Sequence, residues 1–249
     1  MSMNRIAYGV REICNPLTFE RLDHVLARAG LRPGARALDI GTGNGMVAAH
    51  IAETFGLEIT ALERDPEMAA LARERTKGRG APGSLSIETV ESGDYLSTIA
   101  PVHFISALGT TGAAGRDERD AERTFRTLAQ ALEPGGWLFW ADVFWARPPS
   151  DPMRQIIGIT NHFESHQGWI EAGRAAGLEP FYATTSPQQD WDDLIWDTWQ
   201  ATEAWVRANP ERPEGAMLLM RARMIRDMFI IEGRETMGFG LYLFRKAPA

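Results

Sequence analysis

A run of glycines directly after a short apolar segment carries the clearest chemical signal in this chain. Residues 37–40 (Ala-Leu-Asp-Ile) lead into Gly41-Thr42-Gly43-Asn44-Gly45, and we expect a helix from Met46. Glycine lets the backbone turn sharply and lets a ligand lie directly against the main chain. The first N–H groups of the following helix have no partner within the helix and can face such a ligand. The pattern predicts a ligand site at a strand end, and the alternative is a glycine turn that holds no ligand.

A second acidic residue favours a nucleoside-type ligand. Residues 57–62 read as the next strand, and Glu63 closes it. A carboxylate there can take both hydroxyls of a ribose, and it does not pair with a phosphate. Arg64 follows and would favour a phosphorylated ribose, but successive side chains of a strand point to opposite faces. The dinucleotide fingerprint has a third glycine where this chain has Met46, so a dinucleotide is disfavoured.

Several motifs resemble those of the class I S-adenosylmethionine-dependent methyltransferases. Residues 38–45 are similar to the first motif of that family, and Glu91-Ser92-Gly93-Asp94-Tyr95 to the motif whose acid contacts adenine. Residues 132–138 (Leu-Glu-Pro-Gly-Gly-Trp-Leu) resemble the turn that enters the fifth strand. Thr42 stands where the first motif commonly has cysteine. Three further segments resemble a bacterial subgroup of small-molecule methyltransferases: residues 15–18, 107–111 and 144–149.

The resemblance covers nearly the whole chain and implies S-adenosyl-L-methionine as cofactor and methyl donor. It implies that Asp39 and the glycine turn hold the methionine portion, that Glu63 binds the ribose, and that Asp94 and Tyr95 meet the adenine. The cofactor-binding residues that we expect are Asp39, Gly41, Thr42, Gly43, Gly45, Glu63, Arg64, Asp94, Tyr95, Leu108 and Gly109.

Composition agrees with a single cytoplasmic enzyme that acts on a small molecule. The chain has 249 residues, 44% of them hydrophobic, which is ample for one core. A formal net charge of -7 disfavours a nucleic-acid partner, although Arg221, Arg223 and Arg226 form a local basic cluster. Cys14 is the single cysteine, which excludes an intrachain disulfide and fits a reducing compartment. We find no apolar run that predicts a membrane span and no signal-peptide core, and we expect a monomer or homodimer.

Alternating strand and helix patterns predict an α/β fold. We expect a doubly wound, seven-stranded, mostly parallel sheet of the Rossmann-like methyltransferase type with an antiparallel last strand. Residues 1–249 form one domain, with an N-terminal flap over residues 1–18 and a helical cap inserted at residues 186–236. The expected strands are 36–40, 57–62, 85–88, 102–108, 136–144, 179–185 and 237–245. The expected helices of the main fold are 19–29, 46–55, one from Asp65-Pro66, 120–132 and 166–177.

The predicted cap is rich in tryptophan and methionine. Its two helices span residues 190–208 and 213–232. The first carries Trp191, Trp196, Trp199 and Trp205, and the second a stripe of Met217, Met220, Met224 and Met228. The simpler interpretation is that these residues glue the helices together and to the sheet. The alternative is an aromatic-rich acceptor pocket, and four tryptophans on one helix cannot all face one seam, so at least one should be free for a ligand or a partner subunit.

Four residues are candidates for acid–base chemistry: Tyr8, Asp142, His162 and His166. Methyl transfer mainly requires that the protein align the nucleophile and exclude water, and a base is needed only when the acceptor still holds a proton. Asp142 ends a strand at the edge where active sites form, but it can equally cap a loop. Tyr8 belongs to the flap, a placement that rests on the resemblance. His162 lies with Glu164 and His166 after the fifth strand, which is too weak a pattern for a metal site, so we expect no metal.

The sequence therefore predicts a methyltransferase that acts on an oxygen or nitrogen nucleophile of a small molecule. Arsenite is disfavoured as acceptor because a single cysteine cannot form a trithiolate site. One alternative is an NAD(P)-dependent oxidoreductase on a similar fold, which Met46 disfavours. The other alternative is a non-catalytic cofactor-binding or scaffolding protein that docks a partner through the tryptophan-rich helices.

Overall fold

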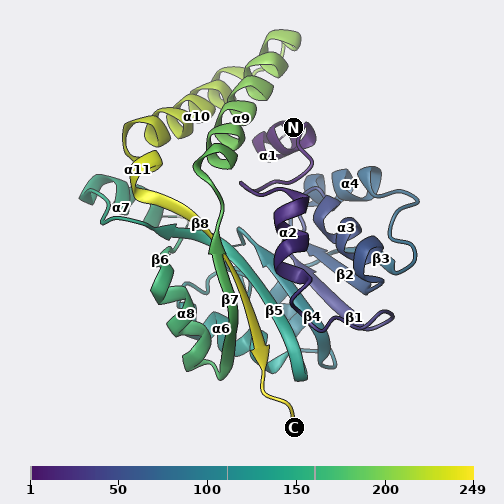
Figure 1. Ribbon diagram of the computed structural model, residues 1–249. Coiled ribbons are helices and arrows are strands. Elements are labelled where there is room, and N and C mark those ends of the chain that lie inside the picture. Colours follow the sequence, from purple (N-terminus) through teal and green to yellow (C-terminus); the bar gives the residue numbers. More distant parts are fainter. Residues whose placement is uncertain (1, 111, 160) are drawn as a thin grey trace.

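One mixed β-sheet forms the centre of the protein, and helices cover both of its faces (Figure 1). The computed structural model describes residues 2–110, 112–159 and 161–249. Its strands are β1 (Arg36–Ile40), β2 (Glu58–Glu63), β3 (Ser84–Thr89), β4 (Val102–Leu108), β5 (Leu132–Trp145), β6 (Glu164–Ser165), β7 (Leu178–Thr185) and β8 (Met237–Lys246). Its helices are α1 (Met3–Gly9), α2 (Phe19–Leu26), α3 (Met46–Phe55), α4 (Pro66–Arg75), α5 (Ser92–Leu96), α6 (Ala121–Gln130), α7 (Asp151–Gly158), α8 (His166–Ala175), α9 (Gln188–Ala208), α10 (Gly215–Met228), the π-helical turn η1 (Phe229–Gly233) and α11 (Arg234–Thr236).

The strand order confirms the predicted fold class. Seven strands follow the order β3-β2-β1-β4-β5-β8-β7, and the two-residue β6 pairs with the end of β5. The strands β1 to β5 pair in parallel, whereas β8 runs antiparallel to both β5 and β7. The order reverses between β1 and β4, and open α/β sheets bind ligands at that switch point, outside the carboxyl ends of the strands.

Two apolar cores, one on each face of the sheet, hold the helices in place. Alternation along β5 sends Phe139 toward the core under α2 and α3, and Trp140 toward the core under α6 and α8. The second core includes Phe125 of α6 and Trp169 of α8, whose rings lie 5.1 and 5.2 Å from that of Trp140. The residues of β4 are buried throughout, as expected for a parallel strand covered on both faces. The strand ends are therefore fixed positions on which a site can be built.

Local signals account for the elements that were predicted and for some that were missed. Asp65 caps α4 and Asp120 caps α6, each through a side-chain oxygen that accepts from a backbone N–H of the first turn. The helices α1, α5 and α7 were not predicted. Ser2 and Ser150 cap α1 and α7 in the same way, so a capping signal was present at both sites.

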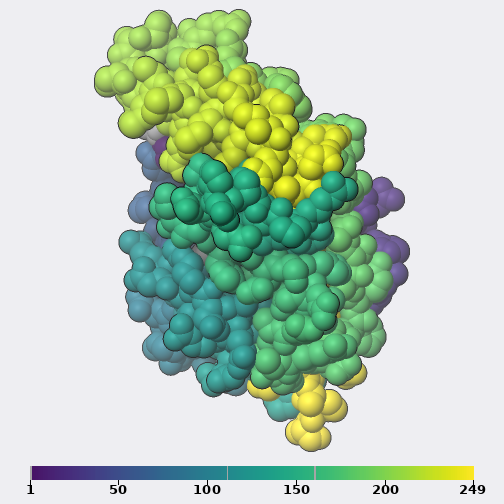
Figure 2. Space-filling model, turned by 90° about the vertical axis from the view of Figure 1, so that its left-hand side faces the viewer, coloured from purple at the N-terminus to yellow at the C-terminus, as the bar shows by residue number. Residues whose placement is uncertain are grey.

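The predicted cap helices lie between β7 and β8, as α9 and α10 (Figure 1). They pack against each other, and α1 packs against α9 and α4. A small apolar cluster of Met3, Ile6 and Leu218 joins α1 to α10, with Trp205 beside it. The end of this region rests on α7, because the Ser150 hydroxyl donates to Glu232 at 2.7 Å; Figure 2 shows the two segments in contact. Among the described residues, no helix is long and apolar enough to cross a membrane.

The methionine stripe of α10 is not part of the core, so the simpler interpretation of these residues was wrong. Met217, Met220 and Met224 are 63%, 67% and 55% exposed. The buried face of α10 is made by Leu218 and Ala222 instead, which lie about a third of a helical turn away from the stripe. Periodicity identified an apolar face but did not show whether anything covers it.

Candidate active site

A cavity of about 620 Å³ lies at the carboxyl ends of β1, β2 and β4. Its floor is the glycine turn after β1, and its other walls come from α1, α9, α10 and the loop that follows β4. Eight of the predicted cofactor-binding residues line it: Asp39, Gly41, Thr42, Gly43, Glu63, Arg64, Leu108 and Gly109. Thr111, the last residue of the segment that resembles the small-molecule subgroup, lies outside the described residues.

Gly43 and Gly45 have different roles in the turn. Gly43 has a φ of +59°, and a Cβ there would lie 3.0 Å from Sγ of Cys14, which covers the turn. Gly45 has a φ of +78°, and a Cβ there would lie 2.9 Å from the side chain of Thr76 and 3.0 Å from that of Ala72. The structure therefore does not bring Gly45 to the cavity. Its small size lets α3 pack closely on α4, whereas Gly43 lies in the cavity wall.

Two buried carboxylates stand at the strand ends next to the turn. Asp39 is 3% exposed and accepts a hydrogen bond from Oγ of Ser106 at 2.6 Å. Glu63 is 9% exposed, and its two oxygens accept from the backbone N–H groups of Gly43 and Asp65, each at 3.0 Å. Burial raises the pKa of both carboxyl groups above the usual range. Each carboxylate has about four lone-pair sites, so Glu63 keeps capacity for further donors.

The residues predicted to meet adenine do not reach the cavity. Asp94 is exposed in the first turn of α5. Tyr95 lines a separate hollow with Arg36, at the opposite edge of the sheet. Because α5 begins at Ser92, the residues nearest the strand end are Glu91 and Ser92, and these two line the cavity in their place.

The cavity wall at Glu91 also contains cations. Arg64 lies 3.9 Å from one oxygen of Glu91, and Arg116 lies 3.5 Å from the other. Arg64 is about half exposed. Its charge is therefore opposed by a carboxylate of the same wall, which disfavours a role in holding a phosphate.

The N-terminal segment forms a fixed cover over the glycine turn. Nδ2 of Asn44 donates to the carbonyl oxygens of Tyr8, Arg11 and Glu12 at 3.2, 2.9 and 3.3 Å. Nη1 of Arg75 donates to the same carbonyls of Tyr8 and Arg11, at 3.2 and 2.7 Å. Oδ1 of Asn44 meanwhile accepts from the first N–H of α3. One buried amide thus joins the cover to the turn, which sequence reasoning missed although Asn44 lies inside the motif.

Two titratable side chains of this cover face the cavity. Burial raises the pKa of the Tyr8 phenol and of the Cys14 thiol, each to about 12. Both groups therefore keep their protons at neutral pH. Tyr8, predicted as a possible base, lines the cavity but is placed there as a hydrogen-bond donor. From the sequence, Cys14 indicated only a reducing compartment. Its position over Gly43 was not predicted.

Asp142 lies away from the cavity, contrary to its predicted catalytic placement. Its side chain is on the sheet face that carries Trp140 and packs against α6 and α8. The carboxyl is 2% exposed, and one oxygen accepts from the N–H of Val143 at 2.7 Å while the other has no partner among the described residues. Burial raises the pKa of Asp142 to about 7. The strand direction correctly places Asp142 near the carboxyl ends of the parallel strands. The alternation of side chains along β5 turns it to the sheet face that carries Trp140, away from the cavity.

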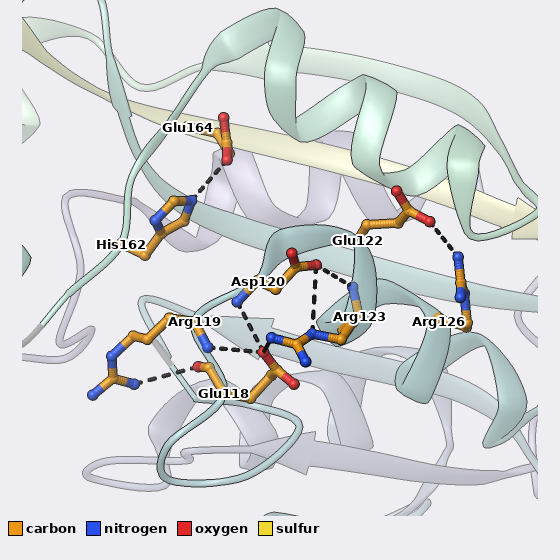
Figure 3. Close-up of polar contacts among 8 residues, drawn as sticks. All are labelled: Glu118, Arg119, Asp120, Glu122, Arg123, Arg126, His162 and Glu164. Atoms are coloured by element: carbon orange, nitrogen blue, oxygen red, sulfur yellow. Dashed lines mark hydrogen bonds and ion pairs between the residues drawn. The ribbon is translucent and has the colours of Figure 1, made fainter.

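His162 lies in a neighbouring hollow. Its Nε2 is 2.7 Å from a carboxylate oxygen of Glu164 (Figure 3). The hollow measures about 560 Å³ and is also lined by Trp145, and Asn161 lies in the walls of both cavities. His166 bonds instead to the hydroxyl of Tyr242, at 3.0 Å. Within the described residues, no three histidine, cysteine or carboxylate side chains are grouped as a metal site would require.

The cap side of the cavity is apolar and basic, not aromatic. The cap helices contribute Leu194, Ile195 and Thr198 from α9, and Arg221 and Ile225 from α10. Arg119, in the loop before α6, also lines the cavity. Tyr8 is the single aromatic side chain in the described lining, so the predicted aromatic-rich pocket was wrong.

The cap tryptophans are used elsewhere. Trp191 is buried and stacks on Phe229, and Trp205 packs beside α1. Arg226 lies over the ring of Trp199 at 4.2 Å. Trp196 is 41% exposed, so one of the four is free, as predicted, but it lies outside the cavity.

The fold and the cavity define a class: an open α/β sheet with a glycine turn and two carboxylates where a nucleoside-type ligand is expected. Residues 17–179 match the family described as "Methyltransferase domain". The match covers well over half of the chain, and the protein therefore belongs to this family of methyltransferases. The family predicted from the motifs is confirmed.

Relatives in sequence and in structure agree with this assignment. The chain is 23% identical to the uncharacterized protein YjhP of Escherichia coli, over 95% of each chain. It is 32% identical to a ubiquinone biosynthesis O-methyltransferase of Xanthomonas campestris, over 61% of this chain and 60% of that protein. A SAM-dependent methyltransferase of Thiobacillus denitrificans, solved with S-adenosyl-L-homocysteine, superposes with a TM-score of 0.82 at 24% identity, over 98% of both chains. A second such complex, from Geobacter sulfurreducens, gives a TM-score of 0.83 at 22% identity, over 97% of this chain and 96% of that one.

Proposed function

We propose that this protein transfers the methyl group of S-adenosylmethionine to a small-molecule acceptor bound under the helices α9 and α10. The observation that carries the proposal is the row of carboxylates along the glycine turn. Asp39, Glu63 and Asp65 line this part of the cavity and form no ion pair with a described cation, whereas the charge of Glu91 beside them is offset by Arg64 and Arg116. Such a wall attracts a ligand with a sulfonium and an ammonium group and repels a pyrophosphate. It therefore favours an S-adenosyl ligand over NAD or NADP.

In this proposal each part of the floor has one task. The free lone pairs of Glu63 accept the two ribose hydroxyls, and Gly41 and Gly43 leave room for the ligand against bare backbone. Glu91 and Ser92 take the adenine contact that the motif had assigned to Asp94 and Tyr95. Asp39, held by Ser106, faces the methionine portion.

The chemical demands on the protein are modest. S-adenosylmethionine supplies a methyl group that its sulfonium already activates. The side chains of this chain have to hold the two ligands in line and keep water out. Tyr8 retains its proton and can donate a hydrogen bond, and Asp142 is buried and does not line the cavity, so it is not placed to take a proton from an acceptor there. An acceptor that is already a free nucleophile suits such a site best.

We also propose that the chain works as one domain, with two covers over the cavity. Residues 186–236 serve as the cap, as predicted from the sequence. The N-terminal segment serves as a tied cover and not as a moving flap, because Asn44 and Arg75 both bind its backbone.

The test is a calorimetric titration of the purified protein with S-adenosylhomocysteine, with NAD and NADP titrated in parallel. Micromolar binding of S-adenosylhomocysteine alone supports the proposal, and transfer from methyl-labelled donor to a panel of acceptors then tests turnover. Binding of a nicotinamide cofactor would favour the oxidoreductase alternative. Donor binding without turnover on any acceptor would favour the non-catalytic one.

A further inference from the structure

Two arginines of the cavity wall have no acidic partner. Arg119 and Arg221 both line the cavity, and among the described residues no carboxylate lies within 4.0 Å of either guanidinium. The other cations in this region are paired: Arg64 lies beside Glu91, and Arg11 forms an ion pair with Asp197. Arg119 is half-buried and Arg221 is exposed, so the N–H groups of both guanidiniums that bond to no described residue are open to water or to a ligand.

Arg119 is held in place by main-chain contacts. Its Nη1 donates to the carbonyl oxygens of Arg116 and Glu118, at 2.9 and 3.3 Å, and the residue is half-buried. Figure 3 shows its guanidinium extending away from the carboxylates of Glu118 and Asp120. The remaining N–H groups bond to no described residue. A guanidinium fixed at one corner, with its other donors free, is ready to bind an oxyanion.

Arg221 stands on the cap side, next to Tyr8. Its positive charge is close enough to lower the pKa of the Tyr8 phenol, although burial has the larger effect and raises that pKa. Because the phenol keeps its proton, Arg221 and Tyr8 together present a cation and a neutral donor. Both groups favour a negatively charged ligand.

The lining of one cavity therefore carries charges of both signs. Carboxylates line the glycine turn, and the guanidinium groups of Arg119, from the loop before α6, and Arg221, from α10, line the same cavity without an acidic partner among the described residues. We propose that the methyl acceptor carries an anionic group, a carboxylate or a phosphate, and that Arg119 and Arg221 bind it. This inference rests on the proposed function, because it assigns the carboxylate-lined part of the cavity to S-adenosylmethionine.

The experiment measures binding of charged and neutral probe pairs to protein saturated with S-adenosylhomocysteine. The pairs are 4-hydroxybenzoate with its methyl ester, and phenyl phosphate with phenol. We expect at least one anionic probe to bind about tenfold more tightly than its neutral counterpart, because each guanidinium offers charge-assisted hydrogen bonds. Arg119→Gln and Arg221→Gln should each remove most of that preference. Arg223→Gln is the matched control, since Arg223 lies on α10 over the ring of Trp199 and outside the cavity.

Each contrary result has a distinct meaning. Equal binding of anionic and neutral probes, or a preference that survives both substitutions, overturns the inference while leaving the methyltransferase proposal intact. Weaker S-adenosylhomocysteine binding in Arg221→Gln, with unchanged probe binding, assigns this guanidinium to the carboxylate of the cofactor and also overturns it. Failure of the unaltered protein to bind S-adenosylhomocysteine, seen before any probe is added, refutes the proposed function and the inference together.

Discussion

The two sides of the cavity differ in origin as well as in chemistry. The side around the glycine turn is acidic, and it is built on strand ends that the core fixes from both faces. The side under the cap is apolar and basic, and most of it comes from α1, α9 and α10. The family match spans residues 17–179 and includes the first side, but it leaves α1, α9 and α10 outside.

This difference explains why the methyl donor can be inferred from the sequence and the methyl acceptor cannot. A methyltransferase family shares its donor, so the part of the site that binds the donor lies in the shared segment. Acceptors differ from one family member to the next. Here α1, α9 and α10 lie outside the match and line the same cavity, and our proposal places the acceptor beneath α9 and α10. Function at the level of reaction class follows from the first side, and substrate choice has to be sought on the second.

The largest expected effect comes from Gly43→Val. A valine at a φ of +59° is strained, and its Cβ would press on Cys14 in the cover, so S-adenosylhomocysteine affinity should fall by more than about 100-fold. Gly34→Val is a matched control, because Gly34 has a φ of +77° with open space around it. Calorimetry on both variants separates backbone strain from loss of the site. Normal affinity in Gly43→Val would mean that no ligand lies at the turn.

Glu63→Ala should have the next largest effect. Loss of the hydrogen bonds to a ribose should weaken S-adenosylhomocysteine binding by about 1–3 kcal/mol. Glu88→Ala, an exposed glutamate on the neighbouring β3, is the control and should bind normally. Unchanged affinity in Glu63→Ala would remove the ribose assignment and with it the main distinction between the two sides of the cavity.

Asn44→Asp should have a smaller effect. It tests the hydrogen bonds that join the N-terminal cover to the glycine turn. Aspartate keeps the oxygen that caps α3, but it cannot donate to the carbonyls of Tyr8, Arg11 and Glu12. We expect affinity for S-adenosylhomocysteine to fall about tenfold, with a lower Tm, because a buried network loses its donors. Wild-type behaviour in a thermal melt and in calorimetry would show that the cover does not depend on this amide.

Asp142→Asn should change S-adenosylhomocysteine affinity by no more than about twofold, because the side chain does not line the cavity and lies on the sheet face that carries Trp140. Its effect is on stability. Burial raises the pKa of Asp142 to about 7 in the folded protein, above an unfolded value near 4. Between these values the folded state retains a proton that the unfolded state releases, so the carboxyl destabilises the fold increasingly as pH rises, by up to about 1.4 kcal/mol per pH unit. The variant should therefore gain stability over wild type at pH 8 and not at pH 4, as denaturant melts at both pH values would show.

The parts of the fold that follow local chemistry were predictable. The bounds of β1, α3 and β4 agree with the sequence patterns, because apolar strands, glycine stops and helix caps act within a few residues. Helix α5 was missed because a five-residue helix is too short for a periodic pattern. The exposure of Met217 and its neighbours could not be read from periodicity, which does not show what covers an apolar face.

The residues of the candidate site likewise fall into those that could be predicted from local sequence and those that could not. That Asp39, Gly43 and Glu63 lie in one cavity wall could be expected from the sequence, because the motif coincides with strand ends, and their binding of a cofactor stays a prediction. Cys14, Arg119 and Arg221 were not assigned, because folding brings them to the cavity from separate segments. Asp142 failed for a third reason: the edge of the sheet was predicted correctly, but the face of the strand was not.

The two chain ends bear on how this protein should be handled. Ser2 both caps α1 and donates from its N–H to Glu67 at 2.6 Å, so the start of the chain is built into the cover of the cavity. Because β8 is antiparallel, it carries the chain from the cavity edge to the opposite edge of the sheet, where Ala249 lies (Figure 1). An affinity tag or a surface-immobilisation anchor therefore belongs at the C-terminus, and fusions at the N-terminus will report on a disturbed site.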